Sequence, residues 1–558
     1  MSLVPRRRPL VGLLSLACIA GGSGAAFAQD AGPVANGLTW LDWVIIAAYA
    51  LGTIGIGAYV GRKQQSTDEY FVGGGKISPL LIGVSLFATL LSTISYLSVP
   101  GEAAGKGPVM LVAQLALPLV FIVVAYGLLP VYMRNRVTSA YELLEEKLGL
   151  SIRLLGATMF LVLRLVWMTL LVYLAAKALS VMMGLDDKWV PLIVFITGFV
   201  SIIYTSIGGL RAVVVTDFMQ TVLLFGGALL VIGTVTWKFG GFGWFPTEWQ
   251  STWDRQPFFS FDPKTRVTVV GTILSVFAWY VATAGGDQTS VQRFMATEDV
   301  GAARRALATQ LIVGCVVSVA LFLVGFSLLG YFGAHADQLP EGMTVANNAD
   351  DLFPRFIAFH LPVGISGLVV SAMFAAAMSS IDSGVNSITA VTLTDFLGRF
   401  GKAPKTDKGK VRFAQVLAFS IGLVVVFGSS LMKYIPGNIT EMTGKTVNLL
   451  TTPIFGLFFF ALFVKFAKPA GAWAGAICGT ITAALIAFSG PIVTLLSTWG
   501  VDPATFGVEI RPLTDEPGAR WMADDPISFQ WISPIAIVVN IAVGTAVSWV
   551  LSRGEGTE

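Results

Sequence analysis

The chain has 558 residues, of which 55% are hydrophobic and only 12% charged, with a formal net charge of +3 and a mean hydropathy of +0.75. Soluble domains carry about 25% charged residues, so this composition excludes a soluble protein with an ordinary solvated surface. The charged residues cluster between apolar runs of about 20 residues, which is the length that crosses a hydrocarbon core as a helix. An all-α polytopic membrane protein is the class that fits.

The residue types that build metal and catalytic centres are scarce and scattered. Cys18, Cys315 and Cys478 lie far apart, mostly in apolar runs, which favours small buried side chains over a disulfide or a metal site. No nucleophile–base pair and no phosphate-cradling GxxxxGK[ST] loop is present. We therefore expect no enzyme, no nucleic-acid partner and no ATP-driven pump, and no obligate protein partner is evident. A channel or an ion-coupled carrier in a lipid bilayer remains.

Residues 1–28 resemble a secretory signal peptide. Arg6, Arg7 and Arg8 form a basic start, Leu10–Ile19 is apolar, and Ala26-Phe27-Ala28 is a small-x-small cleavage site. An uncleaved additional helix is the alternative. Export of this end places the mature N-terminus outside the cytoplasm and indicates a bacterial-type envelope.

About 13 apolar segments follow, each long enough to cross a membrane. In chain order, they lie near Leu41–Val60, Ser78–Val99, Pro108–Met133, Ile152–Met183, Trp189–Ile207, Ala212–Trp237, Val267–Ala284, Ala308–Phe332, Val363–Val391, Val411–Lys433, Thr446–Phe466, Ala470–Thr498 and Ile532–Leu551.

The distribution of basic residues gives these segments an orientation. With the N-terminus outside, the cytoplasmic segments hold about 20 Lys and Arg residues, Arg293 among them, and the external segments about 11. Acidic pairs such as Asp350-Asp351 and Asp524-Asp525 fall in the external loops. Both patterns agree with an odd number of helices and a C-terminus in the cytoplasm. We expect the chain to lie in the inner membrane of the cell.

Ionisable residues within apolar segments are rare, and each indicates a functional site because burial in hydrocarbon costs several kcal/mol. Asp217 lies about two turns into its segment, either as a cation ligand or protonatable carboxylate, or as a residue wetted from the cytoplasmic end. Arg164 interrupts Phe160–Trp167, where it either binds a substrate carboxylate or pairs with a structural acid.

The ninth apolar segment carries a polar stripe. Five of its residues fall on or beside one helical face: Ser379, Ser383, Asn386, Ser387 and Asp382. Hydroxyl and carboxylate oxygens on one stripe suit a hard cation such as Na⁺. Close packing of small residues is the competing explanation, but packing does not account for the acid.

Two apolar segments, five apart in the order, look interrupted. The second is crowded with hydroxyls and ends in Pro100-Gly101, and the seventh ends in Ala282-Thr-Ala-Gly-Gly-Asp-Gln288. Interrupted helices at corresponding positions of two halves are typical of inverted-repeat transporters.

Several stretches together resemble the sodium:solute symporter family, which includes sodium-coupled glucose, iodide, multivitamin, proline and sialic acid transporters. The longest is Tyr204-Thr-Ser-Ile-Gly-Gly-Leu-Arg-Ala-Val-Val-Val-Thr-Asp-Phe-Met-Gln220. The supporting matches, in family order from about residue 40 to 470, are Asp68–Gly75, Glu142-Leu-Leu-Glu145 with Leu148-Gly149, Asp287-Gln288 with Val291-Gln-Arg293, and Ser379-Ser380 with Asn386-Ser387.

The resemblance implies a LeuT-like bundle of five plus five helices in inverted repeat, which works by alternating access. After the predicted signal peptide (1–28), it divides the chain into an N-terminal additional helix (29–77), a first repeat (78–238), an external loop (239–266), a second repeat (267–468), and two C-terminal helices with an external loop (469–558).

The resemblance also implies the sites. The main sodium site would use the carbonyl oxygens of Ala88, Leu91 and Ala376 with the hydroxyls of Ser379 and Ser380. A second cation site, present in some members, matches Asp217 and Ser383. Asp382 stands where members usually have a small hydroxyl residue, so it strengthens that site or carries a proton.

For the substrate, the resemblance implies Ser92, Ser95, Arg164, Asp287 and Gln288. Arg164 lies on the helix that carries the carboxylate-binding arginine of sialic-acid-transporting members. We therefore predict a sodium-coupled symporter of a small polar solute, namely a sugar, a sialic acid or a monocarboxylate. A proton-coupled transporter of the same fold and a membrane solute sensor are the alternatives.

Overall fold

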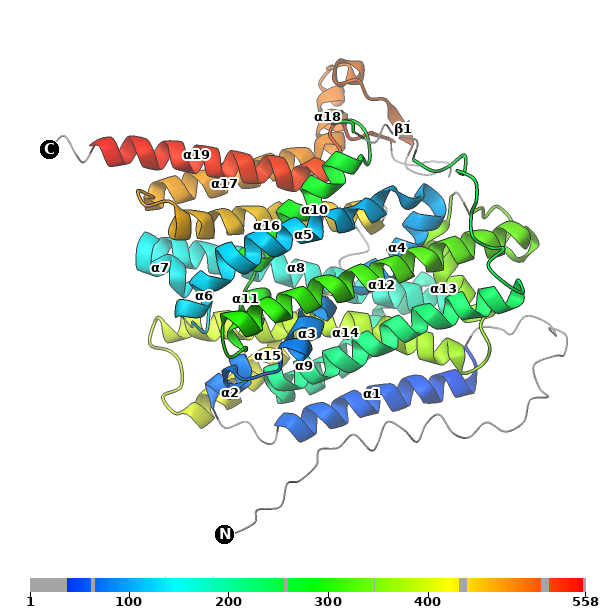
Figure 1. Ribbon diagram of the computed structural model, residues 1–558, viewed down its shortest axis with the longest axis horizontal. Helices are drawn as coiled ribbons and strands as arrows, with labels where there is room; N and C mark the ends of the chain where they lie inside the picture. Colours follow the sequence, from blue (N-terminus) through cyan, green and yellow to red (C-terminus); the bar gives the residue numbers. More distant parts are fainter. Residues whose placement is uncertain are drawn as a thin grey trace, which may run out of the picture.

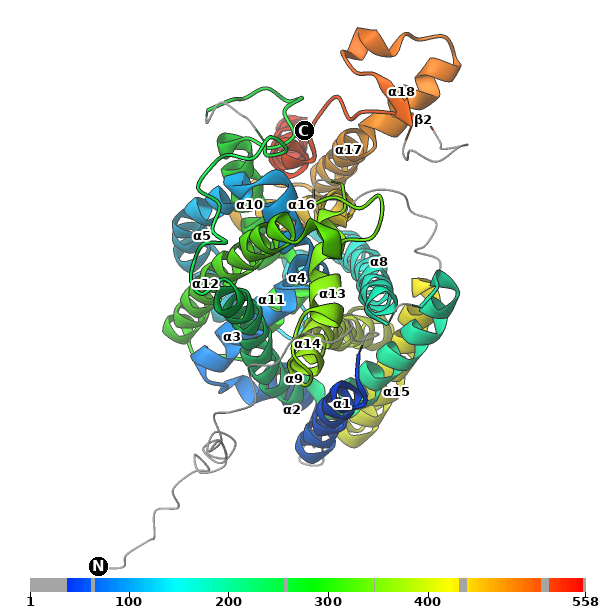
Figure 2. The same cartoon turned by 90° about the vertical axis from the view of Figure 1, so that its right-hand side faces the viewer.

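A computed structural model describes residues 38–554, apart from 62–65, 136, 184, 255–258, 346, 431–438 and 513–520. The predicted signal peptide lies outside these residues. The described chain forms an elongated helical bundle in which most long helices run along one direction (Figure 1), and Figure 2 shows the same bundle turned by 90°.

The helices are α1 (Trp40–Gly61), α2 (Thr67–Val72), α3 (Pro79–Leu90), α4 (Thr93–Lys106), α5 (Leu117–Val123), α6 (Leu129–Asn135), α7 (Glu142–Leu148), α8 (Leu150–Met182), α9 (Val190–Lys238), α10 (Val269–Gly286), α11 (Gln288–Met295), α12 (Val300–Ala334), α13 (Ala349–Phe359), α14 (Ile365–Val391), α15 (Asp407–Ser429), α16 (Ile439–Phe463), α17 (Pro469–Ala487), α18 (Ser489–Thr498) and α19 (Ile532–Gly554). Shorter 3₁₀ and π turns join some of them, of which Pro108–Ala116, Val124–Leu128 and Thr392–Gly398 continue membrane helices.

The predicted apolar segments all coincide with helices, because a backbone in hydrocarbon must satisfy its own hydrogen bonds. Among the described residues, 11 helices are long and apolar enough to span a membrane. The pair α3 and α4, bent by 68°, and the shorter apolar stretch Val190–Ile203 account for the other two predicted segments. The chain is thus a multi-pass membrane protein, and the count of 13 stays a prediction.

The helices differ in depth within the bundle. In the most apolar stretch of the segment Ile365–Gly398, which contains α14, 89% of residues are buried inside the protein, against 11% for α1 and 22% for the segment that contains α19. The segment with α14 therefore lies at the centre of the bundle, and α1 and α19 lie at its edge, where their apolar side chains are free to face lipid.

Helix α9 contains two of the predicted segments. Gly209 interrupts its helical geometry with φ 56° and ψ −169°. A positive φ strains residues that have a Cβ, whereas glycine adopts it readily. This break falls between the predicted segments that end at Ile207 and begin at Ala212.

The two interrupted helices are present, and side chains cap the half-helices that follow each break. Between α3 and α4, Leu91 is extended (φ −78°, ψ 108°), and Ser92 Oγ accepts from the N–H of Ser95 at 3.2 Å. Between α10 and α11, Asp287 is extended, and its Oδ1 accepts from the N–H of Thr289 at 2.8 Å. The sequence suggested an interruption at Pro100-Gly101. In the structure the break lies earlier in the chain, and α4 accommodates Pro100 and continues to Lys106.

The C-terminal part adds two helices and the one sheet found in the described residues. Helices α17 and α19 pack against each other. Strands β1 (Ile510–Pro512) and β2 (Trp521–Ala523) pair antiparallel and project with α18 from the side of the bundle, beyond α17 (Figures 1 and 2). This small hairpin is the exception to an otherwise helical fold.

The segment before α19 is tied to the loop before α10. Ser528 Oγ donates to the carbonyl oxygen of Arg266 at 2.5 Å, and the N–H of Ser528 donates to the carbonyl oxygen of Pro263 at 2.8 Å. Gln530 Nε2 donates to the carbonyl oxygen of Thr265 at 3.1 Å. The C-terminal segment therefore fixes the loop that joins the two predicted repeats.

Candidate ion and solute site

The break between α3 and α4 brings backbone carbonyls against the hydroxyl pair of α14. Ser379 Oγ donates to the carbonyl oxygen of Ala88 at 2.9 Å and to that of Ala376 at 3.1 Å. Ser380 Oγ donates to the carbonyl oxygen of Thr89 at 3.3 Å. All five residues are buried. These oxygens form a cluster of the kind that binds a hard monovalent cation.

Four of the five residues implied for the main sodium site take part in these contacts, and the fifth, Leu91, directly follows the last residue of α3. Leu91 is extended, so its carbonyl oxygen is oriented away from the helical ladder of α3. The set consists of neutral oxygens only, and it fits Na⁺ better than a softer or more highly charged metal ion. The assignment of this cluster to sodium stays a prediction.

The residues implied for a second cation site are distributed over two clusters. In the first, Asp217 Oδ2 accepts from Ser85 Oγ at 2.5 Å and from Arg293 Nη2 at 3.3 Å, and the same Nη2 donates to Ser383 Oγ at 2.5 Å. Asp217 and Arg293 are both fully buried. The guanidinium of Arg293 therefore lies between the predicted ligands Asp217 and Ser383.

Asp382 belongs to the second cluster. Its Oδ1 accepts from Ser201 Oγ at 3.1 Å and from Thr205 Oγ1, both on the first half of α9. Successive residues of a helix point about 100° apart, which explains why Asp382 and the adjacent Ser383 have different partners. The hydroxyl stripe of α14 is likewise divided, since Ser387 Oγ donates to Gln292 Oε1 at 2.9 Å.

Arg293 is the residue of this site that sequence reasoning missed. It was assigned to a cytoplasmic segment by its charge, whereas the structure buries it completely. A hydropathy analysis treats a basic residue near the end of a membrane span as solvent-exposed, because it takes no account of the direction of the side chain. The available signal was Asp217, because a carboxylate buried in a membrane protein requires a counter-charge.

A second feature is a small cavity beside the α3–α4 break. Its walls come from α3, α8, α10 and α16, and among the described residues they comprise Thr89, Leu90, Leu163, Arg164, Trp167, Trp279, Thr283, Asp287, Val447 and Thr451. The cavity measures about 30 Å³, which is room for no more than a few water molecules. An organic solute must therefore widen it in order to bind.

Polar groups of opposite charge meet in this cavity. Arg164 of α8 forms an ion pair with Asp287 at the α10–α11 break, and both side chains are nearly buried. Arg164 Nε and Thr283 Oγ1 have no hydrogen-bond partner among the residues that the structure describes. Unpaired buried donors are costly, so the cavity is suited to a ligand that has hydrogen-bond acceptors.

The other residues implied for the substrate lie outside the cavity lining. Ser92 and Ser95 are neighbours at the start of α4, with their hydroxyls 3.4 Å apart. Gln288 faces the segment before α7, where its Oε1 accepts from the N–H of Ala140 at 2.7 Å and its Nε2 donates to the carbonyl oxygen of Thr138 at 2.8 Å. Gln288 therefore anchors the start of α11.

An ion-pair cluster covers the end of α4 that is farther from the break. Arg266, from the loop before α10, pairs with Glu102 of α4 and with Asp254, the latter at 2.6 Å. These acids raise the pKa of the Arg266 guanidinium although its partial burial opposes this. The cluster joins α4 to the loop between the predicted repeats.

Helix α13 lies on the same end of α4 and brings another acid. A Cβ added to Gly101 would lie 3.0 Å from the Cα of Asp350 and closer still to its Oδ1, so a larger residue here would force α13 or the Asp350 side chain to shift. Burial, with the negative charges of Glu102 and Asp351, raises the pKa of Asp350 to about 6. Its protonation therefore depends on pH in the near-neutral range.

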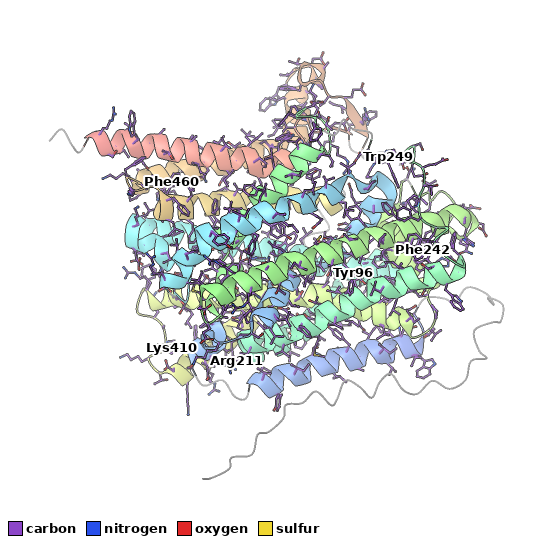
Figure 3. The ribbon with its side chains drawn as sticks, viewed as in Figure 1. Tyr96, Arg211, Phe242, Trp249, Lys410 and Phe460 are labelled. Atoms are coloured by element: carbon purple, nitrogen blue, oxygen red, sulfur yellow. The ribbon has the colours of Figure 1, made fainter. Side chains whose placement is uncertain are left out.

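Two of the motifs that suggested the family meet at the opposite end of the bundle. Arg211, two residues after the break in α9, donates from Nε and Nη2 to the carbonyl oxygen of Gly73 at 3.0 and 2.9 Å. Figure 3 shows Arg211 and Lys410 toward one end of the bundle, and Phe242 and Trp249 toward the other. The predicted cytoplasmic and external segments thus lie at different ends.

The comparison with known proteins agrees with this geometry. The model of the sodium:solute symporter family matches residues 70–479, which is most of the chain. The chain belongs to the sodium:solute symporter family. The predicted family is therefore confirmed.

Individual relatives cover similar lengths. The sodium/sialic acid symporter SiaT of Proteus mirabilis is 30% identical over 460 residues, which is 79% of this chain and 88% of the relative. A putative sodium-dependent multivitamin transporter of Drosophila melanogaster is 29% identical, over 92% of this chain and 86% of the relative. These relatives are transporters rather than enzymes.

The structure resembles that of a sodium-coupled sialic acid symporter solved in a substrate-bound outward-open state. The TM-score is 0.75 at 25% identity, over 92% of this chain and 98% of the other. The predicted fold class, a LeuT-like helical bundle, is confirmed by this similarity.

Proposed function

We propose that the chain is a sodium-coupled symporter that imports a small polar organic solute with a carboxylate group. Membership of the sodium:solute symporter family and the names of the relatives, among them sodium/sialic acid symporters, support sodium as the coupling ion. The chain lies in the inner (plasma) membrane, with its N-terminus outside the cell and its C-terminus in the cytoplasm.

The observation that carries this proposal is the sharing of α3 residues between two sites. The carbonyl oxygens of Ala88 and Thr89 face the hydroxyls of Ser379 and Ser380. Thr89 and its neighbour Leu90 also line the cavity that contains Arg164. A cation that orders the end of α3 therefore orders one wall of the cavity as well.

This sharing accounts for coupling by linkage. If sodium stabilises the conformation in which the cavity accepts solute, then solute must raise the affinity for sodium by the same factor. Sodium bound to the Ala88, Leu91, Ala376, Ser379 and Ser380 oxygens would hold α3 against α14. Without sodium, solute binding alone would have to hold α3 against α14.

Arg164 supports an anionic group on the solute. A guanidinium binds a carboxylate through two parallel hydrogen bonds, and such charge-assisted bonds are among the strongest available. A solute carboxylate displaces Asp287 from Arg164, and Asp287 then accepts from a hydroxyl or amine of the same solute. The preferred solute thus combines one acid with neighbouring donors, as a sialic acid does.

The first test is thermal stabilisation of the purified protein by a panel of solutes. Sialic acids, hydroxylated monocarboxylates and neutral sugars are compared in sodium chloride and in potassium chloride. A ligand of the native state raises its apparent stability by mass action. We expect acids to stabilise the protein in sodium only. Stabilisation by neutral sugars alone, or equal stabilisation in both salts, would contradict the proposal.

A further inference from the structure

The guanidinium of Arg293 is enclosed by oxygens from four helices. Its Nε donates to Ser85 Oγ of α3 at 2.7 Å, and its Nη1 donates to the carbonyl oxygen of Thr289 of α11 at 3.1 Å. Its Nη2 reaches Ser383 Oγ of α14 at 2.5 Å and Asp217 Oδ2 of α9 at 3.3 Å. Two hydroxyls, one carbonyl and one carboxylate thus surround a single positive charge.

The Arg293 cluster lies directly beside the proposed sodium site. Thr89 contributes to both, since its Oγ1 lies 2.8 Å from Ser383 Oγ and its carbonyl oxygen accepts from Ser380. On α14, Ser379 and Ser383 are one helical turn apart and serve different clusters. Two positions for a positive charge therefore follow one another along the α3–α14 interface.

Electrostatics make these two positions unequal. Asp217 supplies the negative charge that a cation would need at the second position, and Arg293 already forms an ion pair with it. A sodium ion placed there would meet a guanidinium a few ångströms away, and like charges repel strongly in an interior of low dielectric constant. The first position consists of neutral oxygens and has no cationic side chain among the contacts described above.

We propose that Arg293 acts as a built-in cation that occupies the second position permanently, so that the transporter binds one sodium ion, at the α3–α14 oxygens. This proposal rests on the proposed function, because it concerns the stoichiometry of the same coupling ion. The residues Asp217 and Ser383 then serve as partners of Arg293, and they position it beside the sodium site.

A purely structural ion pair is the simpler explanation of the same contacts. An Asp–Arg pair that only holds α9 to α11 would have no effect on how many sodium ions bind. The two explanations differ in what happens when the guanidinium is removed. If Arg293 occupies a cation position, its removal makes that position available to a second sodium ion. If the pair is only structural, the removal of Arg293 leaves Asp217 as an unpaired acid.

The experiment counts sodium ions on the purified full-length chain with ²²Na⁺ alone. Binding isotherms are measured by equilibrium dialysis, with choline chloride to hold the ionic strength constant. For the natural sequence we expect one sodium ion per chain and a Hill coefficient near one. Two ions per chain would overturn this inference while the proposed function stands. Binding of no sodium would instead refute the proposed function.

Variants then locate the effect. Arg293→Gln removes the charge, keeps a hydrogen-bonding side chain and should admit a second sodium ion. The double variant Asp217→Asn with Arg293→Gln removes both charges and should return to one. Arg211→Gln, which alters an arginine bound to the Gly73 carbonyl, is the matched control and should keep one ion. If folded Arg293→Gln still binds a single ion, the inference is wrong.

If Arg293→Gln does not fold, the stoichiometry of the natural sequence still decides between one ion and two. Arg293→Lys provides a second variant in that case. A lysine keeps the positive charge, so this variant should keep one sodium ion per chain. A gain of a second ion in Arg293→Lys would also overturn the inference, because the charge is still present.

Discussion

The hydroxyl of Ser379 donates to the carbonyl oxygen of Ala88 across the interface between α3 and α14. A hydroxyl and a carbonyl can hold each other in this way only when no cation lies between them. If sodium binds at the proposed site, both oxygens would turn to the ion, and the hydroxyl proton would need another acceptor. In the proposed site, this hydrogen bond and ion coordination are therefore mutually exclusive.

The first prediction follows from this relationship. Ser379→Ala together with Ser380→Ala should lower sodium affinity at least tenfold, because two of the five proposed ligand oxygens are lost. The protein should stay folded, since both side chains are small and alanine fits the space. Sodium titration of thermal stability measures the affinity. Ser371→Ala is the control, because the one partner of Ser371 Oγ in the described part of the chain is the Gly367 carbonyl of its own helix. Unchanged sodium affinity in the double variant would refute the assignment.

The second prediction concerns Arg164. Arg164→Ala should abolish stabilisation by carboxylate solutes and leave Asp287 as an unpaired buried acid, which also lowers basal stability. Arg164→Lys keeps the charge but loses bidentate geometry, so it should bind the same acids more weakly. Uptake of labelled solute into proteoliposomes gives a second measurement. If neutral solutes lose binding as much as acids do, the role of Arg164 is structural.

The third prediction tests the break in α9. Gly209→Ala places a Cβ on a residue with φ 56°, and such strain costs about 1–3 kcal/mol. The apparent melting temperature in detergent should fall accordingly. Gly226→Ala, in the same helix, is the control, because its added Cβ would meet nothing within 4 Å, and it should be neutral or slightly stabilising. Equal behaviour of the two variants would mean that the break is not required.

The fourth prediction concerns pH. Burial raises the pKa of Asp350 to about 6 from an ordinary 3.8, so the conformation in which α13 packs on α4 binds this proton more tightly than a solvated carboxyl does. By linkage, that conformation gains stability as pH falls through about 6 toward 4 and loses it above 6. Spin-label distances between α13 and α4, measured at pH 5 and pH 7.5, test this.

Asp350→Asn provides the matched comparison for the pH effect. An amide cannot be charged, so the variant should keep α13 docked at both pH values. A pH response of the same size in Asp350→Asn would assign the effect to another group, such as Asp351, whose pKa is also raised by burial.

The sequence was enough to predict the helices, because apolar length is the physical requirement for spanning a membrane. The oxygens of the α3 break followed from the family resemblance, and the structure brings Ala88, Ala376 and Ser379 together. The separation of Asp382 from Ser383 could not be predicted in this way, because it depends on which neighbouring helix each side of α14 meets. Arg293 was missed for the same reason.

The hydrogen bonds from Ser528 and Gln530 tie the last part of the chain to the loop before α10. The family match ends at residue 479, so this tether lies beyond the region that the match covers. Arg266 sits in the tethered loop and holds the far end of α4. We therefore expect a substitution at Ser528 to change the rate at which α4 and this loop move, more than the affinities for ion and solute.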